Sequence, residues 1–256
     1  MRFNKNLSSL QQKMAASSAG THRRFEVFKA LGIISGQTIL DIGCGAGHLI
    51  EDLALAVGKK GRVIGIDPSE AQLESAHERC KSFNNVELLC VAADQTKLKN
   101  NLIDAATSTQ TLEYIKDVDA TIYEIARVLK SQSKFVNVSI LWDHFKFHGP
   151  ENKLNDLIHE AFKAHCFHQM LPMELDMRLR NAKFTNIKSN SLAFLVTNRH
   201  ANSPAKFSEE ILARSALKQG ISEDKVLKWR EQLATAEQEG RFGFTSFPVI
   251  TEANLR

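Results

Sequence analysis

The chain lacks long apolar runs and has few cysteines. No stretch approaches the roughly 18 consecutive apolar residues that a membrane helix needs, and the N-terminus lacks the apolar segment of a signal peptide. The four cysteines form no C-x-x-C pair, so neither a zinc site nor a disulfide framework is expected. We therefore expect no membrane span, no bound metal and a reducing, cytoplasmic location.

Net charge is also small. The 256 residues carry a formal charge of +4, which is far from the dense basic surface of a nucleic-acid-binding protein, so no nucleic-acid partner is expected. Hydrophobic residues make up 43% and charged residues 24%, which is typical of a chain with a sizeable packed core. The length suits one large domain, or a core domain with an added cap.

Apolar patterns alternate between strand and helix, which predicts an α/β fold. We expect a Rossmann-like, seven-stranded, mostly parallel sheet with helices on both faces. The strands are predicted at 38–42, 62–66, 86–91, 103–108, 135–140, 186–196 and 242–250. The helices are predicted at 25–31, 48–57, 69–81, 117–130, 152–167, 173–181, 207–218 and 222–239.

The pattern is more regular in the first half than in the second. We expect an N-terminal arm over residues 1–20, followed by one domain over 21–256. Within this domain, residues 21–140 would bind a cofactor and residues 141–256 would bind an acceptor. The helices at about 198–240 would form a lid inserted before the last strand, and their apolar side chains would form either ordinary core or a wall for the acceptor.

A glycine-rich turn, Asp41-Ile-Gly43-Cys-Gly45-Ala-Gly47, follows the first strand and precedes a helix. Glycine allows a tight turn and lets a ligand approach the backbone, and the helix N-terminus favours a carboxylate. The spacing is not the G-x-G-x-x-G of nicotinamide-binding proteins. Asp41 would disfavour a pyrophosphate, but it could hold the ammonium group of an amino acid.

Two more acidic residues follow predicted strands. Asp67 ends the second strand about twenty residues past the turn, where a carboxylate can accept both hydroxyls of a ribose. The alternative is that Asp67 caps the next helix. Asp94 follows the third strand, where it could accept the amino group of adenine or could simply cap a turn.

Taken together, these segments resemble the class I S-adenosylmethionine (SAM)-dependent methyltransferases. Within them they are similar to the type 11 group, which includes the ubiquinone and menaquinone C-methyltransferases. Four segments match in order and cover roughly residues 20–140: Ile39–Leu49, Val63–Ala76, Ala92–Asp94 and Asp104–Lys130. The resemblance implies that SAM is the cofactor and that S-adenosylhomocysteine is the product.

The resemblance also implies which residues contact the cofactor. It assigns Asp41, Gly43, Gly45 and Gly47 to the methionine part, Asp67 and Pro68 to the ribose, Ala93 and Asp94 to the adenine, and Thr109 and Gln110 to the pocket beside the sulfonium. In one departure, Ser131-Gln132-Ser133 stands where the family usually has a Pro-Gly-Gly turn. We expect this to alter a turn far from the cofactor.

The acceptor side has no fixed motif, because methyl transfer mainly needs alignment and exclusion of water. Some acceptors also need a general base. His144, after the fifth strand, is the candidate base and Trp142 a candidate wall of the site. The alternative is that His144 and His148 are exposed loop residues.

Basic and amide side chains give further acceptor-binding candidates. Arg23 and Arg24 precede the first predicted helix and could close over the site or hold an anionic acceptor. The alternative is that they form a solvated basic turn. Asn198, next to Arg199, follows the sixth strand and is a candidate to reach the pocket.

Several acceptors are not expected. The chain has no N-P-P-Y or D-P-P-Y motif for a flipped base and no cysteine motif after the fourth strand, and its thiols are too scattered for arsenite. We therefore predict a small-molecule acceptor, methylated at O, N or C, and a monomer or homodimer. The alternatives are a protein or RNA methyltransferase, or a SAM-binding module without catalysis.

Overall fold

The computed structural model describes residues 14–256, and its main element is a seven-stranded sheet. The strand order is β3-β2-β1-β4-β5-β10-β7. Only β10 runs antiparallel to its neighbours β5 and β7, so the predicted seven-stranded, mostly parallel sheet is confirmed. The strands are β1 (Thr38–Ile42), β2 (Arg62–Ile66), β3 (Val86–Leu89), β4 (Ile103–Thr109), β5 (Leu129–Ile140), β7 (Phe184–Ser191) and β10 (Pro248–Leu255).

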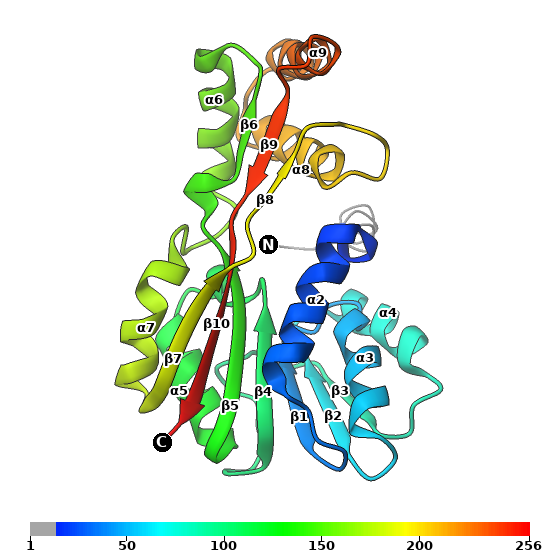
Figure 1. Ribbon diagram of the computed structural model, residues 1–256, viewed down its shortest axis with the longest axis vertical. Coiled ribbons are helices and arrows are strands. Elements are labelled where there is room, and N and C mark those ends of the chain that lie inside the picture. Colours follow the sequence, from blue (N-terminus) through cyan, green and yellow to red (C-terminus); the bar gives the residue numbers. More distant parts are fainter. Residues whose placement is uncertain (1–13) are drawn as a thin grey trace.

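Helices cover both faces of this sheet (Figure 1). One face packs against α2 (Ser18–Leu31), α3 (His48–Val57) and α4 (Glu70–Cys80), and the other against α5 (Val118–Val128) and α7 (Leu171–Asn181). Successive residues of a strand point to opposite faces. On β5, accordingly, Phe135 belongs to the core under α5 and α7, and Val136 belongs to the core under α2 and α3.

A second, smaller sheet sits above the first and forms what we call the cap. The cap consists of β6 (Lys146–His148), β8 (Phe194–Val196), β9 (Gly243–Ser246), α6 (Asn152–Lys163), α8 (Pro204–Lys218) and α9 (Glu223–Gln238). Its strand order, β6-β9-β8, repeats the order β5-β10-β7. Three strands of the large sheet therefore continue, after a break, into the cap (Figure 1). Phe147, Trp229 and Phe244 are fully buried in a separate core there.

Two of the predicted strands were wrong in this region. The single strands predicted at 186–196 and 242–250 are each two strands, β7 and β8, and β9 and β10, which belong to different sheets. The chain changes partners at residues 192–193 and at Phe247, the short links between the sheets. The predicted helix 152–167 ends at Lys163, and the predicted boundary at residue 20 falls inside α2.

The turn before β5 also differs from the prediction. The helix predicted to reach residue 130 ends at Val128, and β5 begins directly at Leu129 rather than at 135. The unusual Ser131-Gln132-Ser133 segment bulges out of the ladder. Gln132 has φ 66° and the β4–β5 register shifts there. This bulge lies at the amino end of β5, away from the strand ends that carry the candidate site. None of the helices within residues 14–256 is long and apolar enough to cross a membrane.

Candidate active site

The predicted cofactor residues follow the carboxyl ends of neighbouring parallel strands. β1 lies between β2 and β4 in the sheet, and the chain leaves β1 for α3 on one face and β4 for α5 on the other. Ligands of open α/β sheets bind in the crevice that such a reversal creates. The glycine turn after β1, Asp67 after β2 and Thr109 at the end of β4 all lie at this edge of the sheet.

Two glycines of the turn are needed for different reasons. Both have positive φ, 71° at Gly43 and 52° at Gly45. A Cβ at Gly43 would lie 2.2 Å from the side-chain oxygen of Thr111, so this glycine lets the loop after β4 pack against the turn. A Cβ at Gly45 would meet nothing closer than 4.0 Å. The open space beside Gly45 is where a ligand could approach the backbone.

This difference predicts different effects of alanine at the two positions. Gly43→Ala is expected to lower the free energy of unfolding by roughly 2 kcal/mol or more, because a steric clash adds to the backbone strain. Gly45→Ala carries the strain alone and is expected to cost about 1 kcal/mol. Thermal or urea unfolding measures both values, and adding Thr111→Ala to Gly43→Ala should restore part of the loss. Equal losses at the two glycines would show that the Thr111 contact is unimportant.

Asp41 is a buried carboxylate without a partner. Asp41 is 3% exposed, and its carboxylate makes no hydrogen bond or ion pair with another residue of the described chain. Burial, followed by repulsion from Asp67, raises the pKa of Asp41 to about 7. A buried carboxylate is costly unless it is neutral or paired, so this position favours a cationic ligand group.

Asp67 is held by the backbone around it. One carboxylate oxygen accepts a hydrogen bond from the Gly45 N–H at 3.0 Å and the other from the Ser69 N–H at 2.9 Å. Burial raises the pKa of Asp67, and these two hydrogen bonds act against that rise. Asp67 thus ties the glycine turn to the start of α4, and each oxygen keeps capacity for one more donor, such as a ribose hydroxyl.

The end of β4 carries two unusual features. The Thr109 hydroxyl oxygen is buried and has no hydrogen-bond partner. Gln110 has φ 51°, and its N–H donates to the Val138 carbonyl at 2.7 Å. Unpaired buried polar atoms and left-handed residues other than glycine are rare and concentrate at functional sites. In the loops nearby, Ala93 and Asp94 are half-buried and Pro68 is exposed.

The acceptor candidates separate into two groups. Arg23 and Asn198 line one cavity of roughly 430 Å³, between the start of α2, the segment around β8 and the start of α8. Trp142 lines a different hollow of roughly 260 Å³ beside α6. His144 is exposed, with its ring 5.8 Å from that of Phe247. The structure therefore does not bring His144 and Trp142 together with Arg23 and Asn198.

The neighbouring residues Arg23 and Arg24, which lie within α2 rather than before the first helix, differ in their contacts. Arg24 donates to the Ala15 carbonyl and lies 3.5 Å from a carboxylate oxygen of Asp52. Arg23 makes no hydrogen bond or ion pair with another described residue. Burial lowers the pKa of Arg23 to about 10, while Glu113 acts to raise it. Arg24 is thus fixed by the protein, whereas the guanidinium of Arg23 is left free.

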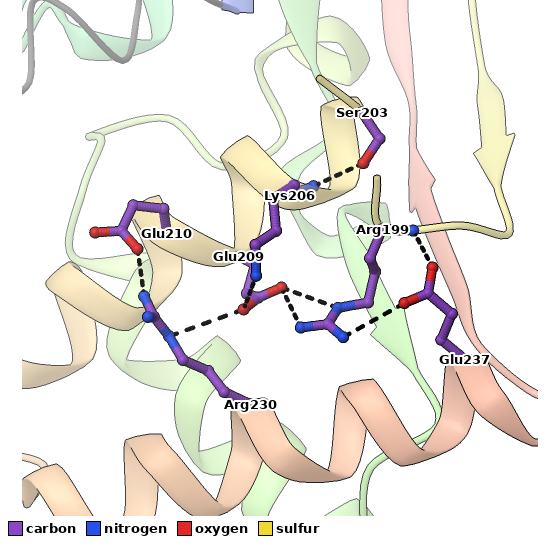
Figure 2. A network of polar contacts seen from close by, with 7 residues as sticks. All are labelled: Arg199, Ser203, Lys206, Glu209, Glu210, Arg230 and Glu237. Atoms are coloured by element: carbon purple, nitrogen blue, oxygen red, sulfur yellow. Dashed lines mark hydrogen bonds and ion pairs between the residues drawn. The ribbon is translucent and has the colours of Figure 1, made fainter. Parts of the chain in front are cut away.

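Arg199 belongs to a polar network inside the cap (Figure 2). Its guanidinium donates to Glu209 at 2.8 and 3.0 Å and lies 3.6 Å from Glu237. Glu209 is 1% exposed and also accepts from Lys206 at 3.0 Å. Arg199, grouped with Asn198 from the sequence, therefore joins the segment after β8 to α8 and α9 rather than lining the cavity.

Sequence reasoning missed Glu113. It lies in η1 (Leu112–Tyr114), one turn past β4, and is fully buried. Its carboxylate accepts from the Ser139 hydroxyl at 3.0 Å and the Ile140 N–H at 3.4 Å. Burial raises its pKa to about 7. The only signal in the sequence was an acidic residue between apolar neighbours just after a strand.

The family of the chain follows from comparison with known proteins. A family model described as a methyltransferase domain matches residues 33–210. The chain belongs to this family, whose cofactor is SAM, and its fold is that of the class I SAM-dependent methyltransferases. The class that the sequence resembled is thereby confirmed.

Individual relatives are more distant. The chain is 36% identical over 141 residues to 2-phytyl-1,4-naphtoquinone methyltransferase of Nostoc sp., covering 53% of this chain and 58% of that protein. It spans about half the length of the curated relatives that it matches. The YcgJ protein of Bacillus subtilis has the same fold, with a TM-score of 0.64, 18% identity and coverage of 92% and 99% of the two chains. So does phosphoethanolamine N-methyltransferase 2 of Haemonchus contortus, solved with S-adenosylhomocysteine, with a TM-score of 0.67, 17% identity and coverage of 99% and 58%.

Proposed function

We propose that this chain transfers a methyl group from SAM to a small-molecule acceptor. The observation that carries the proposal is Asp41, a buried carboxylate that has no partner within residues 14–256 and lies beside a glycine turn that is open at Gly45. A positively charged amino acid group would satisfy this carboxylate, and SAM has one. The relatives support the acceptor class, because one is named for a naphthoquinone and another for a phosphorylated amine.

We propose a contact with one part of the cofactor for each of the predicted residues. Asp41 would hold the ammonium group, with Gly43, Gly45 and Gly47 around the methionine part. Asp67 and Pro68 would hold the ribose, Ala93 and Asp94 the adenine, and Thr109 and Gln110 the surroundings of the sulfonium. The Thr109 hydroxyl supports this fit, because it is buried without a partner. When bound, SAM supplies a methyl group that is already activated.

The rest of the chain would position the acceptor and exclude water. The cavity at Arg23 and Asn198 lies between α2 and the cap, and Arg23 is within electrostatic reach of Glu113, which follows β4. We propose this cavity as the acceptor site. His144 and Trp142 do not line this cavity. We propose them as base and wall only for an acceptor that binds beside them instead and must lose a proton.

Calorimetric titration with SAM and S-adenosylhomocysteine tests the cofactor. We expect micromolar binding to the wild type. Asp67→Ala should weaken it by about tenfold to a hundredfold, since each hydrogen bond to a charged group contributes about 1.5–3 kcal/mol. Asp224→Ala, at an exposed position in the first turn of α9, is the matched control and should bind like the wild type. No binding by the wild type would refute the proposal.

Turnover separates the remaining alternatives. If SAM binds, small quinols, phenols and amines should be screened for methyl transfer without any added macromolecule. Transfer only to an added protein or RNA would point to a macromolecular acceptor. Binding without transfer to any acceptor would point to a SAM-binding module that acts as a sensor.

A further inference from the structure

We propose that the acceptor is an organic anion with an apolar body, and that Arg23 binds its anionic group. This inference rests on the proposed function, and it specifies the chemistry of the acceptor site. The cavity has a volume of roughly 430 Å³, which lies within the common range for small-molecule sites. It is bounded by α2, the β7–β8 segment and the start of α8, so both the large sheet and the cap contribute to it.

The formal charge around this cavity is positive. The described residues that line it include the cation Arg23 but no carboxylate. The hollow beside α6 is different, because Asp143, Asp156 and Glu160 line it together with two lysines. A positively charged cavity raises the local concentration of anions and disfavours cations.

The guanidinium of Arg23 lacks an ion-pair partner among the described residues. Arg23 is half-buried, and charges that are withdrawn from water are normally paired in proteins. Two other arginines that are largely buried follow this rule, Arg24 with Asp52 and Arg199 with Glu209. Arg23 has no such partner, and Glu113 does not come within ion-pair distance. The planar guanidinium can bind a carboxylate or phosphate through two parallel hydrogen bonds, so an anionic ligand would supply the missing partner.

The N-termini of two helices also favour an anion in this cavity. Ser18 and Ser203 line the cavity, one at the first residue of α2 and the other at the N-cap of α8. These helices have 14 and 15 residues. The positive end of each helix dipole therefore borders the cavity and adds to its attraction for an anion.

Apolar side chains also line the cavity. Its lining includes Phe194 and Val196 of β8, Pro248 of β10, and Leu192 of the link between β7 and β8. Asn198 and Thr197 add polar groups at the edge. A ligand that fits both the guanidinium and these apolar side chains has an aromatic or aliphatic body and one anionic end, as in an aromatic acid or a phosphorylated hydrocarbon.

Binding of matched probes tests this assignment. 6-Hydroxy-2-naphthoate is compared with 2-naphthol, and decanoate with decanol, by fluorescence or calorimetric titration with and without S-adenosylhomocysteine. We expect the wild type to bind the acids about tenfold or more tightly than the neutral partners. Arg23→Gln should remove this preference, and Arg23→Lys should keep part of it.

Arg24→Gln is the matched control, because Arg24 is the next residue of α2 and is already paired with Asp52. It should keep the full preference for the acids. Thermal unfolding should show that Arg23→Gln is folded, since the side chain of Arg23 has no hydrogen-bond or ion-pair partner among the described residues. The absence of any preference in both probe pairs, or a preference that survives Arg23→Gln, would overturn the inference. Titration of the same variants with S-adenosylhomocysteine separates this outcome from failure of the cofactor site.

Discussion

Glu209→Ala is expected to lower the free energy of unfolding by about 3 kcal/mol or more. Glu209 is 1% exposed, and its carboxylate is shared by Arg199 and Lys206, with Arg230 at 3.9 Å (Figure 2). Removing it would leave the buried guanidinium of Arg199 with only Glu237, at 3.6 Å. Truncating one partner of a buried ion pair is costly because the other charge stays buried without full compensation. Urea unfolding of wild type and variant measures the loss.

The adjacent residue provides the control. Glu210 also pairs with two arginines, Arg214 and Arg230, but about a third of its side chain is exposed. Exposed ion pairs contribute little, so Glu210→Ala should cost no more than about 1 kcal/mol. Equal losses for the two variants would show that burial of the Glu209 network is not what stabilises the cap. Binding of SAM by Glu209→Ala should be retained, because the cofactor residues lie on the large sheet.

The first five strands could be predicted because their signals are local. Each is a short apolar run, and a glycine turn or an acidic residue after the strand marks where a ligand would lie. The structure places β1, β2 and β4 within one residue of the predicted ranges. Asp41 and Asp67 come to one edge of the sheet for the same reason, since parallel strands end on the same side.

The cap could not be predicted in the same way. An apolar alternation shows that a segment is a strand, but not which sheet it joins. The run around Phe194 therefore looked continuous although it crosses from one sheet to the other. The arginines show the same limit. Arg23 and Arg199 look alike in sequence. Arg199 is paired because Glu209 and Glu237, which are distant in sequence, lie beside it in the fold, whereas Arg23 has no such neighbour among the described residues. The carboxylate of Glu113 likewise finds its hydrogen-bond donor in Ser139, 26 residues later in the sequence.

Asp41→Asn is expected to have opposite effects on stability and on cofactor binding. The pKa of Asp41 is raised from an ordinary 3.8 to about 7 in the folded protein. The folded state therefore favours the neutral acid. The stability that protonated Asp41 contributes to the folded state is complete below about pH 4 and is lost as the pH rises to about 7. At pH 8, asparagine mimics the neutral acid and should raise the free energy of unfolding of the cofactor-free protein. Each pKa unit corresponds to about 1.4 kcal/mol, so the gain is up to about 4 kcal/mol.

Cofactor binding should respond in the other direction. If Asp41 holds the ammonium group of SAM, it must be ionised in the complex, so SAM should bind more tightly as the pH rises from 6 to 8. Calorimetry in buffers of different ionisation enthalpy would detect the released proton. Asp41→Asn should weaken binding at pH 8 by about tenfold or more and remove this pH dependence.

Glu113→Gln is the matched control, because Glu113 is equally buried with a pKa of about 7 but is not assigned to the cofactor. It should share the gain in stability at pH 8 and keep the pH-dependent binding of SAM. Normal binding by Asp41→Asn would instead make the glycine turn alone responsible for holding the methionine part.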